Sequence, residues 1–244
     1  MMRKLLVLFL LVFLLVPTVC LADADLIGEE SLIVSASDPC ANLGTWDLYW
    51  DGDHPSGFDY YCVAGGTGQW SITEAVSTIV GAAPTGMTGN VLLINEQDEH
   101  LSKSPTGFWA SAEGVIQFDF YGPLNANHYV FEGRKDLDEE FYIQVGSTGV
   151  VRLQLEDPTN GTQYVLSSAY TVSANTTTTI KIGWSNGAQY IKIGANPAET
   201  FTLTYAGYTS EPAIVYFGVS VYTTIDTGGG NIDKIYMSNT YTAP

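Results

Sequence analysis

Basic residues are scarce in this sequence. Nine Lys and Arg residues stand against 26 Asp and Glu residues, so the 244-residue chain has a formal net charge of −17. Because recognition of nucleic-acid phosphates needs clustered Lys and Arg, this shortage excludes nucleic acid as a partner. It also disfavours anionic polysaccharides, unless a local group of Arg134, Lys135 and Arg152 overrides the net charge. A neutral or cationic ligand fits the charge better, although acidity can serve solubility alone.

Long apolar runs are absent apart from one at the N-terminus. Arg3 and Lys4 precede the apolar run 5–16, and small residues follow it up to Ala22. This order is typical of a secretion signal, and we predict a signal peptide over residues 1–22, with cleavage after Ala24 as the alternative. The run is short for a bilayer span. We therefore expect a secreted protein, extracellular or on the cell surface, with no transmembrane segment after removal of the signal.

Cysteine is also scarce, with three residues in the chain. Cys20 lies in the predicted signal, which leaves Cys40 and Cys62. An even pair in an exported protein predicts a disulfide between them, which would stabilise the fold by roughly 3 kcal/mol. A metal site on these thiols would need further ligands, and only His54 lies nearby in the sequence. We therefore interpret the pair as structural.

Helical periodicity is nearly absent, and most of the chain alternates apolar and polar residues between turn-forming Gly, Asn, Asp and Pro. The clearest hairpin joins residues 177–184 to residues 189–193 through Asn186-Gly187, because both turn residues tolerate positive φ. Short strands at this spacing predict an all-β fold, a two-sheet antiparallel sandwich with almost no helix. We expect an extended leader over 23–43 and one domain over 44–244. Further strands are predicted at 46–50, 58–63, 69–73, 90–95, 108–111, 115–121, 141–145, 151–156, 201–205, 213–222 and 231–238.

The segment from Gly114 to Asp157 contains three successive alternating strands. A period of two indicates strands with one face on a core and one face toward water, and we predict that the three strands share one sheet. Tyrosine rings and planar amides on the polar face are suited to sugars. A plain solvated face would have the same pattern, and that alternative stays open. The predicted ligand-binding residues are Gln117, Asp119, Tyr121, Tyr142, Gln144, Arg152 and Gln154, with the loop residues Asn125, Asn127, His128 and Tyr129 closing one end.

Three stretches of the chain carry a resemblance to a known family. They are 114–120, the hairpin entry and turn at 176–187, and the closing strand 232–238. These stretches resemble the concanavalin A-like lectin/glucanase superfamily, which includes laminin-G-like modules. The resemblance covers about residues 44–240 and implies a jelly roll. Because the superfamily includes sugar-binding modules, glycoside hydrolases, polysaccharide lyases and adhesive domains, it implies the fold more strongly than the function.

Catalytic patterns of that superfamily are missing from the sequence. A retaining glucanase needs paired carboxylates on one strand face, and the nearest acidic cluster, 138–140, is predicted to be a solvated turn. The Gln-Ile-His element of alginate lyases is missing, because Phe-Asp follows Gln117. We therefore predict no catalytic residues and favour a non-catalytic carbohydrate-binding module whose partner is a carbohydrate or cell-surface glycan. A structural or adhesive protein that self-associates is the first alternative, and a polysaccharide lyase or glycoside hydrolase is the second. The three histidines, His54, His100 and His128, are predicted to lie in loops.

No cofactor is expected, with a structural calcium ion as the alternative. Asp51 and Asp53 place two carboxylates in one predicted turn, and the resemblance puts Asp233 on a strand where some jelly rolls hold an ion. The full calcium-loop pattern is not present, so a plain turn at Asp51 and Asp53 is the competing interpretation.

Overall fold

The computed structural model describes residues 38–73, 80–94, 100–103, 113–134, 140–157, 161–204, 214–218 and 230–244. The chain divides into two compact units, Met1–Asp38 and Pro39–Pro244, and the second unit is described below. The predicted signal and residues 23–37 of the predicted leader lie outside the described residues. None of the residues described belongs to a helix with the length and hydropathy of a membrane span.

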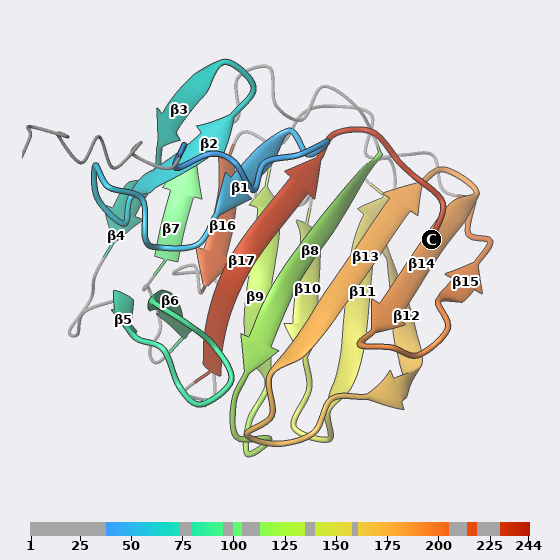
Figure 1. Cartoon of the computed structure of the whole chain (residues 1–244). Helices are drawn as coiled ribbons and strands as arrows, with labels where there is room; N and C mark the ends of the chain where they lie inside the picture. The colour runs from blue at the N-terminus through green and yellow to red at the C-terminus, as the bar shows by residue number, and fades with distance from the viewer. Residues whose placement is uncertain are drawn as a thin grey trace, which may run out of the picture. The chain divides into compact units, whose positions relative to one another are not determined.

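Two antiparallel sheets pack face to face, which confirms the predicted all-β jelly-roll sandwich (Figure 1). The residues described contain no helix. Sheet A has ten strands in the order β15-β14-β13-β8-β17-β1-β2-β3, with β6 also paired to β17 and β5 paired to β6. Its strands are β1 (Leu48–Trp50), β2 (Tyr60–Val63), β3 (Gly66–Gln69), β5 (Val80–Ala82), β6 (Asn90–Ile94), β8 (Gly114–Tyr121), β13 (Thr178–Ser185), β14 (Ala188–Ile193), β15 (Glu199–Phe201) and β17 (Gly230–Ser238).

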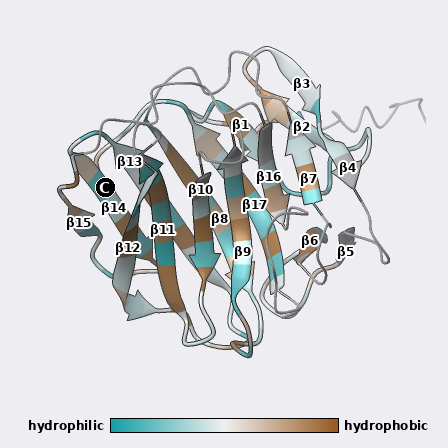
Figure 2. Cartoon of the chain, turned by 180° about the vertical axis from the view of Figure 1, so that it is seen from behind, coloured by the Kyte–Doolittle hydropathy of each residue, from teal (hydrophilic) through white to brown (hydrophobic). Residues whose placement is uncertain are grey.

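Sheet B lies behind sheet A in the view of Figure 1 and has seven strands in the order β12-β11-β10-β9-β16-β7-β4. Its strands are β4 (Ser71–Thr73), β7 (His100–Lys103), β9 (His128–Arg134), β10 (Glu140–Val145), β11 (Val150–Asp157), β12 (Thr162–Thr171) and β16 (Ile214–Gly218). Figure 2 shows this sheet from outside, with hydrophilic and hydrophobic residues alternating along its strands.

The core fills the space between the two sheets. Alternate residues of β8, Ile116, Phe118 and Phe120, are fully buried there, as are Ile143 of β10 and Leu153 of β11. Removing one large apolar side chain of this kind from water contributes roughly 1.5–3 kcal/mol to folding. The alternation seen in the sequence therefore correctly separates core positions from outer positions on these strands.

Residues 38–43, the end of the predicted leader, form turns before β1. The Leu43 N–H donates to the Cys40 carbonyl at 3.0 Å, and a disulfide joins Cys40 to Cys62 of β2 with Cα atoms 5.3 Å apart. The predicted disulfide is thus confirmed. The bridge ties this segment to sheet A, and the second compact unit begins at Pro39.

Most of the predicted strands that lie within the described residues are present, and one of them is divided into two strands. The hairpin of β13 and β14 turns at residues 186–187, where Gly187 has a φ of 86°. The predicted strand 69–73 is divided, however, because β3 ends at Gln69 in sheet A and β4 begins at Ser71 in sheet B. The buried Trp70 between them packs against Tyr61 with ring centroids 4.7 Å apart. The predicted strand 108–111 lies outside the described residues.

Candidate functional site

The predicted ligand-binding residues do not share one sheet. β8 belongs to sheet A, whereas β10 and β11 belong to sheet B. Gln117, Asp119 and Tyr121 therefore lie on the outer face of sheet A, and the other four residues lie on the outer face of sheet B. The prediction of a single face was wrong because the chain changes sheets between β8 and β9. Alternation reports which side of a strand faces the core, but not which sheet the strand joins.

On the outer face of sheet B, the four predicted residues of β10 and β11 form two hydrogen-bonded cross-strand pairs. Tyr142 stands opposite Gln154, and Gln144 stands opposite Arg152. The Tyr142 hydroxyl donates to Gln154 Oε1, and Arg152 Nη1 donates to Gln144 Oε1 at 2.7 Å. These bonds hold the four side chains in fixed orientations across the strand pair.

Several polar side chains on this face are buried although they point away from the core. Gln154 is 4 % exposed, Glu132 of β9 is 3 % exposed, and Gln144 and Glu156 are also buried. Withdrawing such groups from water is unfavourable unless they are hydrogen-bonded, so the outer face of sheet B is not an ordinary solvated face. The Gln163 amide on the edge strand β12 donates to Glu156 Oε2 at 3.1 Å.

Strand β9 adds Glu132, which sequence reasoning did not single out, and Tyr129, which was predicted to lie in a loop at one end of the face. Tyr129 stands opposite Gln144, and Glu132 stands opposite Tyr142. The Tyr129 and Tyr142 rings meet edge to face with centroids 5.3 Å apart, a favourable arrangement for aromatic pairs. A register shift at Ile143/Gln144 breaks the alternation of β9, which is why its sequence did not show a strand.

The residues predicted to form a loop at one end of the polar face lie partly in a turn and partly in β9. Asn127 accepts a hydrogen bond from the Ser147 N–H at 3.1 Å, which joins two connecting turns. His128 is in β9 and points between the sheets, where its ring lies 5.3 Å from that of Phe120 and Nε2 lies 2.8 Å from the Pro123 carbonyl. Burial lowers the pKa of His128 below its ordinary value. His128 and His100 are in strands, so the prediction that all three histidines lie in loops was wrong.

The outer face of sheet A is dominated by carboxylates near the middle of β17. Asp233 pairs in register with Asp119, whose Oδ1 accepts a hydrogen bond from the Thr179 hydroxyl at 2.5 Å. Lys234 Nζ lies 3.5 Å from Asp119 Oδ2. Burial, reinforced by the nearby charges of Asp51 and Asp119, raises the pKa of Asp233 to about 7.

Aromatic side chains lie on sheet A beside this acidic region. The ring of Tyr236 lies 4.7 Å from that of Tyr49 and 5.4 Å from that of Trp46. Lys181 Nζ stands 5.5 Å from the centroid of the Trp46 ring, within cation–π range. Gln117 pairs with both Tyr236 and Lys181, so this predicted residue belongs to the aromatic region of sheet A.

The three carboxylates predicted for calcium have different surroundings. Asp53 Oδ1 accepts hydrogen bonds from the backbone and side-chain nitrogens of Asn90, both at 2.9 Å, and so anchors its turn to β6. Asp51 accepts from the Tyr49 hydroxyl at 2.7 Å and from the Asp53 N–H at 3.0 Å. Asp51 and Asp233 influence each other electrostatically. Calcium binding itself stays a prediction.

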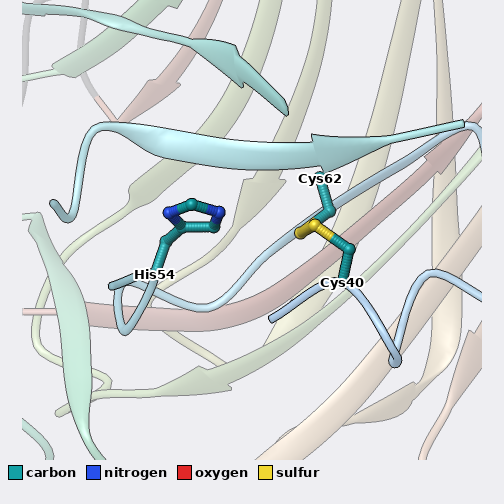
Figure 3. Close-up of side chains that lie close together, drawn as sticks. All are labelled: Cys40, His54 and Cys62. Atoms are coloured by element: carbon teal, nitrogen blue, oxygen red, sulfur yellow. A yellow bond between two sulfur atoms is a disulfide. The ribbon is translucent and has the colours of Figure 1, made fainter. Parts of the chain in front are cut away.

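The described residues contain one group of three His, Cys, Asp or Glu whose donor atoms lie within 4.8 Å of one another. It consists of Cys40, His54 and Cys62 (Figure 3). Both sulfurs belong to the disulfide and are not thiolates, so the group lacks the ligands that a zinc ion requires. This agrees with the interpretation of the cysteine pair as structural.

Comparison with solved structures gives the fold a wider context. No family model and no curated protein matches the sequence. The receptor-binding domain of a botulinum neurotoxin C/D mosaic serotype is 12 % identical, covers 81 % of this chain and 48 % of its own, and has a TM-score of 0.60. A botulinum neurotoxin serotype D ligand-binding domain in complex with N-acetylneuraminic acid is 11 % identical, covers 81 % of this chain and 48 % of its own, and has a TM-score of 0.60. A Ruminococcus gnavus sialidase CBM40 bound to α2,3-sialyllactose is 16 % identical, covers 63 % of this chain and 91 % of its own, and has a TM-score of 0.53.

These structures share the fold of this chain. The chain spans about half the length of the neurotoxin domains that it matches. At identities between 10 % and 16 %, the likeness establishes the β-sandwich and does not by itself transfer any site.

Proposed function

We propose that the protein is a secreted, non-catalytic carbohydrate-binding module that binds glycan on the outer face of sheet B. The observation that carries the proposal is the set of buried, hydrogen-bonded polar side chains on that face. Groups fixed in this way require little ordering when a ligand binds, which favours affinity. We assign the contacts to Tyr142, Gln144, Arg152 and Gln154.

The chemistry of these residues suits a sugar. Planar amides and a guanidinium supply donors and acceptors for hydroxyl groups, and the paired Tyr129 and Tyr142 rings offer an apolar surface. Arg152 uses Nη1 on Gln144 and has further N–H groups for a ligand. A side-chain carbon at residue 146 would lie 2.9 Å from Arg152 Nη1, so the glycine avoids a steric clash with the guanidinium.

The comparisons support the same proposal at the level of fold. Two of the similar structures were solved with sugars, N-acetylneuraminic acid and α2,3-sialyllactose. We further propose that the chain belongs to the concanavalin A-like lectin/glucanase superfamily and is exported by its N-terminal signal, with which the disulfide is consistent. Because the chain is strongly acidic, we propose a neutral glycan as the ligand.

A glycan array followed by calorimetry on the best binder tests the proposal. We expect Arg152→Ala to weaken binding at least tenfold, about 1.4 kcal/mol, because a charged donor is lost from the contact face. Gln117→Ala is the matched control, since it comes from the same predicted set but lies on sheet A and should leave binding unchanged. Absence of any bound glycan, or loss of binding in Gln117→Ala alone, would contradict the proposal, and binding restricted to sialylated glycans would overturn the choice of a neutral ligand.

A further inference from the structure

We propose that the disulfide between Cys40 and Cys62 is a thiol-exchange site. An external low-molecular-weight thiol forms a mixed disulfide with Cys40, while His54 stabilises the thiolate that Cys62 becomes. This inference does not rest on the proposed glycan site, which lies on sheet B, whereas the bridge is attached to β2 of sheet A. The bond keeps its structural role in the oxidised protein, and exchange is a further property of the same bond.

His54 lies beside the disulfide, in the segment between β1 and β2. A ring nitrogen of His54 lies within 4.8 Å of both sulfur atoms. Nδ1 accepts a hydrogen bond from the Ser56 N–H at 3.1 Å, and the nitrogen turned toward the sulfurs is Nε2 (Figure 3). The ring is therefore fixed on one side by the backbone and faces the bridge on the other.

The hydrogen bond from Ser56 also determines where the ring proton lies. Because Nδ1 accepts, the proton of the neutral imidazole is on Nε2. Nε2 is buried, and it has no hydrogen-bond partner within the described part of the chain. A buried donor without an acceptor is unfavourable. His54 thus directs an unsatisfied N–H donor at the two sulfur atoms.

Packing holds the ring in this orientation. The His54 ring stacks on the ring of Tyr60 in β2, with centroids 5.6 Å apart and an interplanar angle of 20°. Tyr60 and Cys62 are two residues apart on the same strand, so their side chains point to the same side of sheet A. The Gly57 N–H donates to the His54 carbonyl at 2.9 Å and closes the turn. The donor is therefore in place before the disulfide opens.

The two sulfur atoms differ in accessibility. Cys62 is 2 % exposed, whereas Cys40 is half-buried in the turn segment 38–43. An external thiolate therefore reaches Cys40 more readily, and Cys62 is the leaving group. A disulfide sulfur accepts hydrogen bonds weakly, but a thiolate carries a charge and accepts them strongly. The departure of Cys62 gives the Nε2–H of His54 the acceptor that it lacks in the oxidised protein.

The exchange proceeds in two balanced steps. The first external thiolate bonds to Cys40 Sγ, the bond between the protein sulfurs breaks, and its electron pair leaves on Cys62. A second external thiolate then attacks the mixed disulfide and releases Cys40 as a thiolate. Two external thiols are oxidised to a disulfide, the bridge is reduced, and the protons of the external thiols pass through solvent to the protein thiolates. Because His54 stabilises the thiolate and not the disulfide, it favours the reduced form.

The fold has attachments near this site that do not depend on the bridge. The Asp47 N–H donates to the Met237 carbonyl at 2.9 Å. Asp47 Oδ2 accepts from the Ser238 hydroxyl and from the Asn239 N–H, both at 2.9 Å. These bonds tie the start of β1 to the end of β17, so opening the disulfide should release the turn segment 38–43 and leave the sandwich in place. We therefore expect the exchange to be reversible.

Equilibration of the full protein with glutathione redox buffers at pH 7 tests the proposal. His54→Phe removes the Nε2 donor and keeps a ring that can stack on Tyr60. We expect the equilibrium constant for reduction to be at least tenfold larger in the wild type than in His54→Phe, about 30 mV for this two-electron couple. His54→Gln, whose amide can still donate, should lie between them. Equal constants in the wild type and His54→Phe would overturn the proposal.

Peptide mass mapping after a brief reaction with glutathione tests which sulfur is attacked. We expect glutathione on Cys40, and its presence mainly on Cys62 would contradict the assigned direction.

A single-thiol variant distinguishes stabilisation of the thiolate from a purely structural role of His54. In Cys40→Ser, the ultraviolet absorbance of the thiolate at pH 7 measures the ionised fraction of Cys62. We expect this fraction to be several-fold larger in Cys40→Ser than in Cys40→Ser/His54→Phe, with urea denaturation used to verify that both variants are folded. A change in stability alone would leave the ionised fraction unchanged. The same fraction in both folded variants would refute the role of His54.

Discussion

The two outer faces of the sandwich use similar polar residues in different arrangements. On sheet B, polar side chains pair with one another across strands, as Arg152 does with Gln144. On sheet A, like charges stand opposite each other, as Asp119 does with Asp233. The paired polar groups of sheet B agree with the neutral ligand proposed for that face, whereas the opposed carboxylates of sheet A disfavour an anionic ligand there.

The comparison also shows that an outward-facing position is not necessarily exposed. Tyr190 of β14 lies on the outer face of sheet A opposite Gly183, and it is fully buried. A side-chain carbon at Gly183 would lie 2.2 Å from the Tyr190 ring, so the ring lies directly over the glycine. The ring of Tyr241, in the C-terminal segment, packs against the Tyr190 ring with centroids 5.9 Å apart. That end of the face is therefore closed by the chain itself.

We expect the largest change in stability when Tyr190, which closes this end of the outer face of sheet A, is truncated. Tyr190→Ala removes a fully buried ring and should lower the free energy of unfolding by about 3–4 kcal/mol, as for large-to-small changes in a core. Urea denaturation measures the change. Tyr170→Ala, at a 38 % exposed position on sheet B, is the control and should cost less than about 1 kcal/mol. Equal costs would show that the burial of Tyr190 adds nothing to stability beyond an exposed tyrosine.

The second prediction separates the stability of sheet A from binding on sheet B. Replacing Cys40 and Cys62 together with Ala should lower the free energy of unfolding by about 3 kcal/mol, because the unfolded chain gains entropy. Urea denaturation of the oxidised wild type and the variant gives the difference. Glycan affinity should be unchanged at temperatures where the variant is folded, because the bridge is attached to β2 of sheet A. A loss of affinity in the folded variant would show that the two faces are coupled.

The sequence predicted local geometry well and sheet membership poorly. Alternation over 115–121 correctly placed Phe118 in the core and Gln117 outside, because strand periodicity is a local property. The separation of β8 from β10 depends on where the chain changes sheets, which no local pattern records. For the same reason, no local pattern indicated that Asp119 of β8 would stand opposite Asp233 of β17.

The smallest predicted effect lies between the faces, at His128. Burial lowers the pKa of His128 in the folded state, so below about pH 6.5 the unfolded state binds a proton that the folded state does not. The contribution of His128 to the free energy of unfolding should therefore fall as the pH decreases from 7 to 5.5, by up to about 1.4 kcal/mol per pH unit, whereas the raised pKa of Asp233 contributes in the opposite direction over the same range. The difference in the free energy of unfolding between His128→Gln and the wild type, measured by urea denaturation across that range, isolates the contribution of His128. His128→Gln should become more stable relative to the wild type as the pH falls, and a difference that does not change with pH would contradict the prediction.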